Sequence, residues 1–424
     1  KGVAGRVRAL ARSVQMSFLP RGVSEDYYAF TLWRIAQRIV SSTVSVFGTQ
    51  SLLLALGVKT HKVGAAAASG WVVANAIGKF SKMSFAAGWG RDFDSDAKRW
   101  RFRAALMWVF ANGMEILVYV VHNSAPRSFV FLVALSVSLK QISILTSSAT
   151  RGTFYKQFAG QNENLGDITA KGDAQVAIAD LAGMVVGIQL ARMAGSTPLY
   201  IWGAWLLLSA ADFLCILRSL DTIVFKFLNL ERCSVVAHHY VRGGGAVLPP
   251  SEVSAGEPIL SRPEHATKQG NFATGWYYDV VRGYWAATFR KLSETTVTPP
   301  ELRKLLGLFA NGQYMLLHTR HPKCPEAPPR PCVVLRQSAT EDDVFQAMLA
   351  LEHLKRDIEA LPAEERRSLD SEMAGALPLI KSARDYAQAK VGDIVQGISE
   401  AGWTCKSSGR PKLMVGYIRH RAIW

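Results

Sequence analysis

Three aspartates at alternate positions, followed at once by cations and a tryptophan, form the first stretch whose residue types could do chemistry. An EF-hand calcium loop shows the same alternation, but it requires glycine at its sixth position and glutamate at its twelfth. Counted from Asp92, these positions hold Ala97 and Arg103, so calcium binding of that kind is not expected. The residues of this candidate loop site are Asp92, Asp94, Asp96, Lys98, Trp100 and Arg101.

A structural role for the same stretch is the simpler interpretation. Ser95 or Asp96 can cap the start of a helix, and the cations that follow can anchor this helix at lipid headgroups. These cations are Lys98, Arg99, Arg101 and Arg103. Physical arguments alone favour the helix cap and interface anchor.

A second stretch, residues 149–175, combines glycines with cations. Glycine allows backbone N–H groups to converge, and nearby cations would suit a phosphate, such as that of pyridoxal phosphate. Lys171 could form a Schiff base with an aldehyde, although the stretch contains no P-loop and no GxGxxG pattern. The residues of this candidate phosphate loop are Arg151, Gly152, Lys156, Asp167, Lys171 and Asp173.

Catalytic and metal-binding patterns do not occur in the sequence. There is no Ser-His-Asp, Cys-His or HExxH arrangement, so we expect no enzymatic activity. His238 and His239 are adjacent and point to different faces of a helix, which argues against a shared metal. We therefore expect no metal and no cofactor, with pyridoxal phosphate as the alternative. Five scattered cysteines without a CxxC pair favour a reducing compartment.

Long apolar blocks occupy the chain between residues 29 and 217 and must position these stretches. They are Ile39–Val58, Val63–Gly78 with its continuation to Trp89, Ala104–His122, Ser128–Leu139 with its continuation to Ala149, Ala174–Ala191 and Leu199–Leu217. About 20 apolar residues cross a bilayer as a helix, which predicts a helical membrane bundle of about six spans. Small residues at every fourth position, Gly70, Ala74 and Gly78 and again Gly183 and Gly187, predict close helix contacts.

Charged residues within the apolar blocks are candidates for function, because burying a charge in the membrane is energetically costly. They are Lys79, Lys82, Glu115, Lys140, Asp180 and Asp212. We expect carboxylates to pair with lysines across the bundle, Asp180 with Lys79 in particular, and to line a polar cavity. Purely structural ion pairs are the alternative.

The distribution of cations predicts the orientation in the membrane. Six spans place thirteen Lys and Arg residues on the side of both termini and four on the other side. This asymmetry follows the positive-inside rule and puts both termini in the cytosol, matrix or stroma. This asymmetry accounts for the net charge of +16. The sequence has no basic face interleaved with aromatic residues, so nucleic-acid binding is not expected. The basic start of the chain is similar to an organellar transit peptide.

Three motifs occur in order along the chain. They are Gly88-x-x-x-Asp92-x-Asp94-x-Asp96-Ala-Lys-x-Trp-Arg101, the run from Ala149-Thr-Arg-Gly152 to Asn164–Gln175, and Leu228-Asn-Leu-Glu-Arg232. In these motifs the chain resembles the root UV-B sensitive (RUS) family of eukaryotic membrane proteins. Ahead of the last of these motifs, where the resemblance predicts a basic residue, this chain has Asp221. The resemblance implies a multi-spanning protein, often plastid or mitochondrial, that is linked to vitamin B6 homeostasis and light sensitivity. It implies no reaction.

The second half of the chain is polar and rich in proline. Strands are expected at Gln313–Thr319, Cys332–Arg336 and Leu413–Ile418. Helices are expected at Thr222–Val241, Trp276–Lys291, Glu341–Ala360 and about Glu364–Ala401. A capping box of Thr340 and Asp343 opens the third of these helices.

These observations predict a mainly α protein, in which a polytopic helical bundle precedes a small α+β domain. The expected domains are a basic segment (1–28), a membrane domain (29–242), a linker with a short helix (243–299) and a soluble domain (300–424). The expected function is a non-enzymatic role in vitamin B6-linked homeostasis at a mitochondrial inner or plastid membrane, by transport or sensing of a small solute. The alternative is an accessory subunit of a large respiratory or photosynthetic complex. Expected partners are lipids and either other membrane subunits or a RUS-family protein.

Overall fold

The computed structural model describes residues 18–55, 65–90, 92–121, 128–159, 164–195, 197–263, 265, 285, 288–320, 328–369, 373–414 and 421–422. The chain divides into two compact units, Lys1–Ile223 and Val224–Trp424. The boundary between the units lies just after Thr222, where the last long helix of the first unit is capped.

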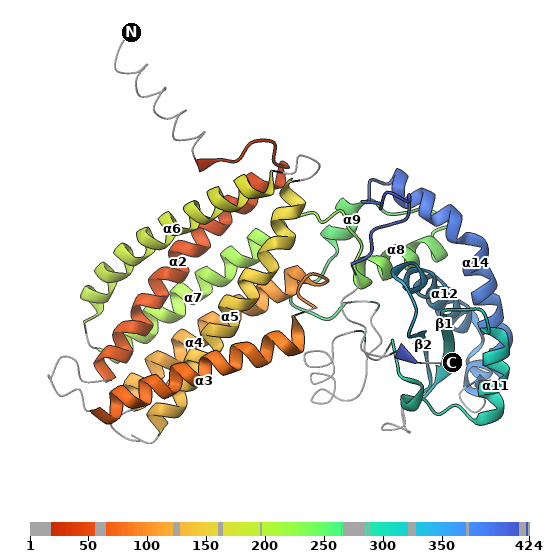
Figure 1. Ribbon diagram of the computed structural model, residues 1–424, viewed down its shortest axis with the longest axis horizontal. Coiled ribbons are helices and arrows are strands. Elements are labelled where there is room, and N and C mark those ends of the chain that lie inside the picture. Colours follow the sequence, from red (N-terminus) through yellow and green to blue (C-terminus); the bar gives the residue numbers. More distant parts are fainter. Residues whose placement is uncertain are drawn as a thin grey trace, which may run out of the picture. The chain divides into compact units, whose positions relative to one another are not determined.

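Long helices make up the described part of the first unit (Figure 1). They are α2 (Asp26–Ala55), α3 (Ala65–Trp89), α4 (Ala97–Val121), α5 (Ser128–Ala159), α6 (Leu165–Ala194) and α7 (Pro198–Asp221). Each apolar block of the sequence contributes to one of them, in order. α2 packs against α4, α6 and α7, and α5 packs against α3 and α4.

Four of these helices, α4, α5, α6 and α7, are long and apolar enough to cross a membrane by length and composition. They indicate a membrane protein. The expected number of about six spans is not reached by this criterion. α2, which carries hydroxyl and amide side chains along its length, and α3, which carries Lys79 and Lys82, do not meet it.

Glycines permit close contact between helices in this unit, as their spacing predicted. A methyl group added to Gly78 on α3 would lie 2.6 Å from Val137 on α5. On α6, a methyl group at Gly183 would overlap the Ile39 carbonyl oxygen of α2, and one at Gly187 would lie 2.8 Å from Val46. The α2–α6 interface therefore depends on the missing side chains.

The second unit is a small α+β fold. Its helices include α8 (Leu230–Arg242), α9 (Pro250–Ala255), η3 (Leu292–Glu294), α11 (Pro299–Leu308), α12 (Glu341–Ala360), α13 (Ala363–Leu369), η4 (Met373–Ala376) and α14 (Leu377–Glu400). Its sheet contains β1 (Tyr314–Thr319), β2 (Arg330–Arg336) and the two-residue β3 (Arg421–Ala422). β1 pairs antiparallel with β2, and β2 pairs parallel with β3.

The core of the second unit surrounds α12. Residues 347–351 of α12 are fully buried, and they pack with β1, β2, α8 and α14. The predicted capping box is present, because the Thr340 backbone N–H donates to Asp343 Oδ2 at 2.8 Å and the Asp343 backbone N–H donates to Thr340 Oγ1 at 3.5 Å. The two long predicted strands and this helix are confirmed.

Three other predictions for the second half differ from the structure. The predicted helix Thr222–Val241 starts only at Leu230, because the Asn229 side chain accepts a hydrogen bond from the Arg232 backbone N–H and caps α8 there. The predicted helix from Glu364 to Ala401 is interrupted between α13 and α14. Leu413 forms only an isolated bridge with Leu228, while residues 415–420 lie outside the described part. Most of the predicted helix Trp276–Lys291 also lies outside it.

Candidate functional site

A cavity of about 300 Å3 lies inside the helical unit, between α2, α4, α5, α6 and α7. Four arginines line it, and we call it the arginine cavity: Arg34, Arg38, Arg101 and Arg151. Hydrogen-bonding groups accompany them, namely Gln37, Trp108, Ser41, Ser143, Ser147 and Ser148. No carboxylate is among its lining residues.

Helical periodicity places these side chains together. Arg34, Gln37, Arg38 and Ser41 occupy positions i, i+3, i+4 and i+7 of α2, which form one face of a helix. Arg101 and Trp108 are separated by two turns of α4, and Ser143, Ser147 and Arg151 recur every fourth residue of α5. The cavity therefore lies toward the end of the bundle at which α2 and α4 begin and α5 ends.

Two of the arginines are neutralised by carboxylates of α6. Arg38 donates to both oxygens of Asp180, from Nε at 2.9 Å and from Nη2 at 2.7 Å. Arg151 forms an ion pair with Asp173. The predicted pairing of Asp180 with Lys79 is wrong, because α3 packs against α5 and leaves Lys79 exposed.

The other two arginines have neutral partners. Arg34 Nη1 donates to the Tyr155 hydroxyl at 2.6 Å, and Arg101 Nη1 donates to the Ser147 carbonyl at 2.9 Å. Neither forms an ion pair within the described residues. Arg34 Nε and Trp108 Nε1 are buried and lack a hydrogen-bond partner in the same part of the chain. The cavity thus has more positive charge and more donors than the protein itself satisfies, which suits an anion.

The candidate loop site contributes only Arg101 to this cavity. Asp94 Oδ1 accepts a hydrogen bond from Thr153 Oγ1 at 2.5 Å, and Asp96 contacts Arg99 at 3.3 Å. Trp100 packs at right angles on Phe93, with ring centroids 5.2 Å apart. The aspartates therefore support the start of α4. No group of metal-ligating side chains occurs among the described residues.

The expected headgroup contacts of the first turns of α4 are wrong in part. The side chains of Lys98 and Arg99 are buried, with 3% and 2% of their residue surface exposed. Trp100 is buried as well, at 6%. These residues pack inside the unit. The Arg103 guanidinium lies over the Trp100 ring, with Cζ 4.7 Å from the ring centre.

The candidate phosphate loop is helical rather than a loop. Arg151, Gly152 and Lys156 lie on α5, whereas Asp167, Lys171 and Asp173 lie on the first turns of α6. Gly152 has no neighbouring atoms that would exclude a side chain. The expected convergence of backbone N–H groups at glycines is therefore wrong for the described residues, and only Arg151 lines the cavity.

Lys171, the candidate for a Schiff base, is engaged elsewhere. Its Nζ contacts Asp167 at 3.0 Å and donates to the Leu19 carbonyl at 3.1 Å. Lys156 is exposed. The arginine cavity has no lysine among its lining residues, so it offers hydrogen bonds and charge but no amine nucleophile.

The remaining interior charges adjoin the cavity or lie apart from it. Lys140 Nζ contacts Glu115 at 2.7 Å and lies 5.4 Å from the Trp108 ring centre, next to the cavity wall. Asp212 Oδ1 accepts a hydrogen bond from Gln37 Nε2 at 2.9 Å. Lys82 on α3 is half-buried.

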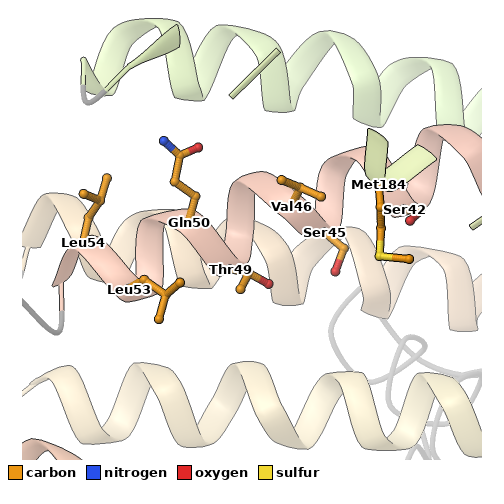
Figure 2. A pocket seen from close by; sticks show the side chains of 8 residues that line it. All are labelled: Ser42, Ser45, Val46, Thr49, Gln50, Leu53, Leu54 and Met184. Atoms are coloured by element: carbon orange, nitrogen blue, oxygen red, sulfur yellow. The ribbon is translucent and has the colours of Figure 1, made fainter. Parts of the chain in front are cut away.

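A second cavity, of about 500 Å3, runs along α2 (Figure 2). Its lining residues are Ser42, Ser45, Val46, Thr49, Gln50, Leu53 and Leu54 of α2 and Met184 of α6. None of these side chains is charged. This cavity consequently offers no opposite charge to an ionic ligand, in contrast to the arginine cavity.

Sequence comparison identifies the group of proteins to which this architecture belongs. Residues 5–244, which contain every residue of the arginine cavity, match the family described as the vitamin B6 photo-protection and homoeostasis domain. The chain belongs to this family, and the resemblance to root UV-B sensitive proteins is confirmed.

Individual relatives agree with this assignment. Protein root UVB sensitive 3 of Arabidopsis thaliana is 32% identical over 61% of this chain and 58% of its own length. Protein root UVB sensitive 2, chloroplastic, of the same plant is 25% identical over 79% of this chain and 70% of its own length. RUS family member 1 of Dictyostelium discoideum is 25% identical over 57% of this chain and 47% of its own length. The chain spans about half the length of several such relatives. No solved structure matches it.

Proposed function

We propose that this chain is a non-enzymatic organellar membrane protein that contributes to vitamin B6 homeostasis by binding a small anionic solute, which it moves across the membrane or senses. The arginine cavity carries the proposal. Four guanidinium groups converge there from α2, α4 and α5, and α6 neutralises only two of them. Placing such charges within apolar helices is costly, so they serve a ligand.

The chemistry of the cavity favours a phosphorylated ligand. A guanidinium group offers paired donors that match the geometry of phosphate oxygens. The unpartnered Arg34 Nε and Trp108 Nε1 supply further donors. The family description links the domain to vitamin B6, whose coenzyme form carries a phosphate. Pyridoxal phosphate is therefore proposed as a bound solute that is held through its phosphate, without a covalent bond to lysine.

The proposed location follows from the cations and from one relative. The cations at the starts of α2 and α4, at the end of α5 and at the start of α6 support this end of the helices as the side that is not translocated. The cavity then lies near the matrix or stromal face. One Arabidopsis relative is named chloroplastic, which supports an organelle. No observation supports the alternative of an accessory subunit.

Calorimetry on the purified chain in detergent tests this function. Pyridoxal phosphate is expected to bind at least tenfold more tightly than phosphate-free pyridoxal. Arg34→Gln and Arg101→Gln should each weaken binding of the phosphorylated form by about 10- to 100-fold, the range for a charged hydrogen bond.

Arg192→Gln provides the matched control, because Arg192 is exposed on α6 in the same unit. This variant should bind like the original chain. Equal affinity for both vitamers, or unchanged binding in the two cavity variants, would contradict the proposal.

A further inference from the structure

One buried carboxylate lies directly behind the wall of the arginine cavity. Asp212 on α7 is 1% exposed. Its Oδ1 accepts the hydrogen bond from Gln37, and Gln37 itself lines the cavity. Its Oδ2 is buried and has no hydrogen-bond partner within the described residues. A single amide therefore separates this carboxylate from any ligand in the cavity.

The charged surroundings of Asp212 come from two neighbouring helices. Arg38 on α2 and Arg101 on α4 interact with it electrostatically, and the Cys215 thiol is the titratable group nearby on α7 itself. Neither arginine forms an ion pair with it in the described part of the chain: Arg38 is bound to Asp180, and Arg101 to the Ser147 carbonyl. α6 contributes no charged group to its surroundings among these residues.

We propose that Asp212 takes up a proton from the aqueous compartment when an anion binds, so that the cavity binds an anion and a proton together. This inference rests on the proposed function of the same cavity. Ionised Asp212 is stabilised by the hydrogen bond from Gln37 and by the fields of Arg38 and Arg101. An anion beside these guanidinium groups opposes those fields, which raises the proton affinity of the carboxylate.

The coupling acts in both directions. If the anion favours protonation of Asp212, protonation must favour binding of the anion by the same factor. Lower pH should thus tighten binding. A dianion that enters with one proton also leaves less uncompensated charge in a low-dielectric interior. In a transporter, the same coupling would link anion movement to the proton gradient.

Inorganic sulfate is the probe of choice, because it remains a dianion between pH 5 and pH 8, whereas phosphate itself titrates. Its binding to the chain in detergent is measured by calorimetry at several pH values, in buffers with different ionisation enthalpies. The expected result is affinity about tenfold higher at pH 6 than at pH 8, with net proton uptake of up to one per sulfate.

Asp212→Asn replaces the carboxylate by an amide of the same shape. This variant should still bind sulfate, without proton uptake and without dependence on pH. Asp221→Asn, at the exposed end of the same helix, should behave like the original chain. Gln37→Met removes the hydrogen bond that stabilises ionised Asp212, so the carboxylate should already be protonated and proton uptake should fall. This second variant keeps the test valid if Asp212→Asn does not fold.

The outcomes separate the two proposals. Sulfate binding that is independent of pH and free of proton uptake in the original chain would overturn the role of Asp212 and leave the anion cavity intact. Proton uptake that persists in Asp212→Asn would overturn it as well, since another group would then take the proton. If neither sulfate nor phosphate binds at any pH, the proposed function fails together with this inference.

Discussion

Arg38 of α2 holds the Asp180 carboxylate of α6 with two hydrogen bonds, of 2.9 Å from Nε and 2.7 Å from Nη2. The pair joins the helix that carries two of the cavity arginines to the helix that carries both compensating carboxylates. It lies one turn from Gly183, where the backbones of α2 and α6 come into contact. Charge compensation and close packing are thus located at the same point of the interface.

Breaking this pair should destabilise the helical unit. In Asp180→Asn, Arg38 loses its ionised partner, and the paired side chains are only 29% and 27% exposed. We expect a loss of about 1–2 kcal/mol, measured by thermal unfolding in detergent. Lys79→Ala, on exposed α3, is the control and should leave stability unchanged. A larger loss in Lys79→Ala than in Asp180→Asn would contradict the observed pairing.

A side chain at Gly183 should separate α2 from α6. The Cβ atom in Gly183→Ala would overlap the Ile39 carbonyl oxygen and lie 2.8 Å from Ser42 Cβ. Because the carbonyl belongs to the backbone of α2, it cannot easily move away. We expect about 1–3 kcal/mol of destabilisation. Gly203→Ala on α7 has no atoms within 4 Å of the new Cβ and should be neutral or slightly stabilising. Equal unfolding temperatures for the two variants would show that the predicted overlap is absent.

The second unit should lose stability in acid through Glu352. Burial of this carboxyl opposes its ionisation, but Lys355 at 2.7 Å and the hydrogen bond with His238 at 3.0 Å outweigh burial and hold its pKa below the usual 4.5. Because the folded pKa is depressed, the stabilisation is fully present above about pH 4.5 and is lost as the pH falls through the folded pKa.

Glu352→Gln tests this dependence. The variant should be about 3 kcal/mol less stable at pH 7, because Lys355, whose side chain is only 18% exposed, then lacks its charged partner. Its stability should also vary less with pH below 4.5. Glu359→Gln, whose side chain is 57% exposed, is the control. Urea unfolding followed across the pH range gives both quantities, and parallel curves for the original chain and Glu352→Gln would exclude the assignment.

The buried cysteines should resist alkylation. Burial raises the pKa of Cys332 to about 11 and also raises the pKa of Cys233. Since the thiolate is the reactive form, about one Cys332 thiol in a thousand is ionised at pH 8. Half-buried Cys405 should react with iodoacetamide before the two buried thiols, which should react only after unfolding. Peptide mass mapping distinguishes the sites, and rapid labelling of Cys332 in the folded chain would contradict its burial.

The positions of the long helices could be predicted from the sequence because uninterrupted apolar residues leave few alternatives. The cavity could be predicted only in part. Arg101 and Arg151 lie within charged stretches that predict a site, whereas Arg34 and Arg38 precede the first apolar block and are not among the predicted site residues. Their spacing of four residues, just ahead of a predicted span, is the signal that could have revealed them.

Partners across the bundle could not be deduced, because they depend on which helices are neighbours. Asp180 faces Arg38 only because α6 packs on α2. Glycine was also ambiguous. Gly172 indicated a loop, yet it is helical, and its missing side chain accommodates the Tyr155 hydroxyl 2.5 Å from where a Cβ would lie. Tertiary packing of this kind overrides the low helix propensity of glycine.

Both carboxylates that balance the cavity, Asp173 and Asp180, belong to α6. Both counter-charges are therefore carried by one helix, whereas the guanidinium groups lie on α2, α4 and α5. Any sliding of α6 would release Arg38 and Arg151 simultaneously and double the number of uncompensated cations. The electrostatic attraction of the arginine cavity for a solute therefore depends on the position of α6.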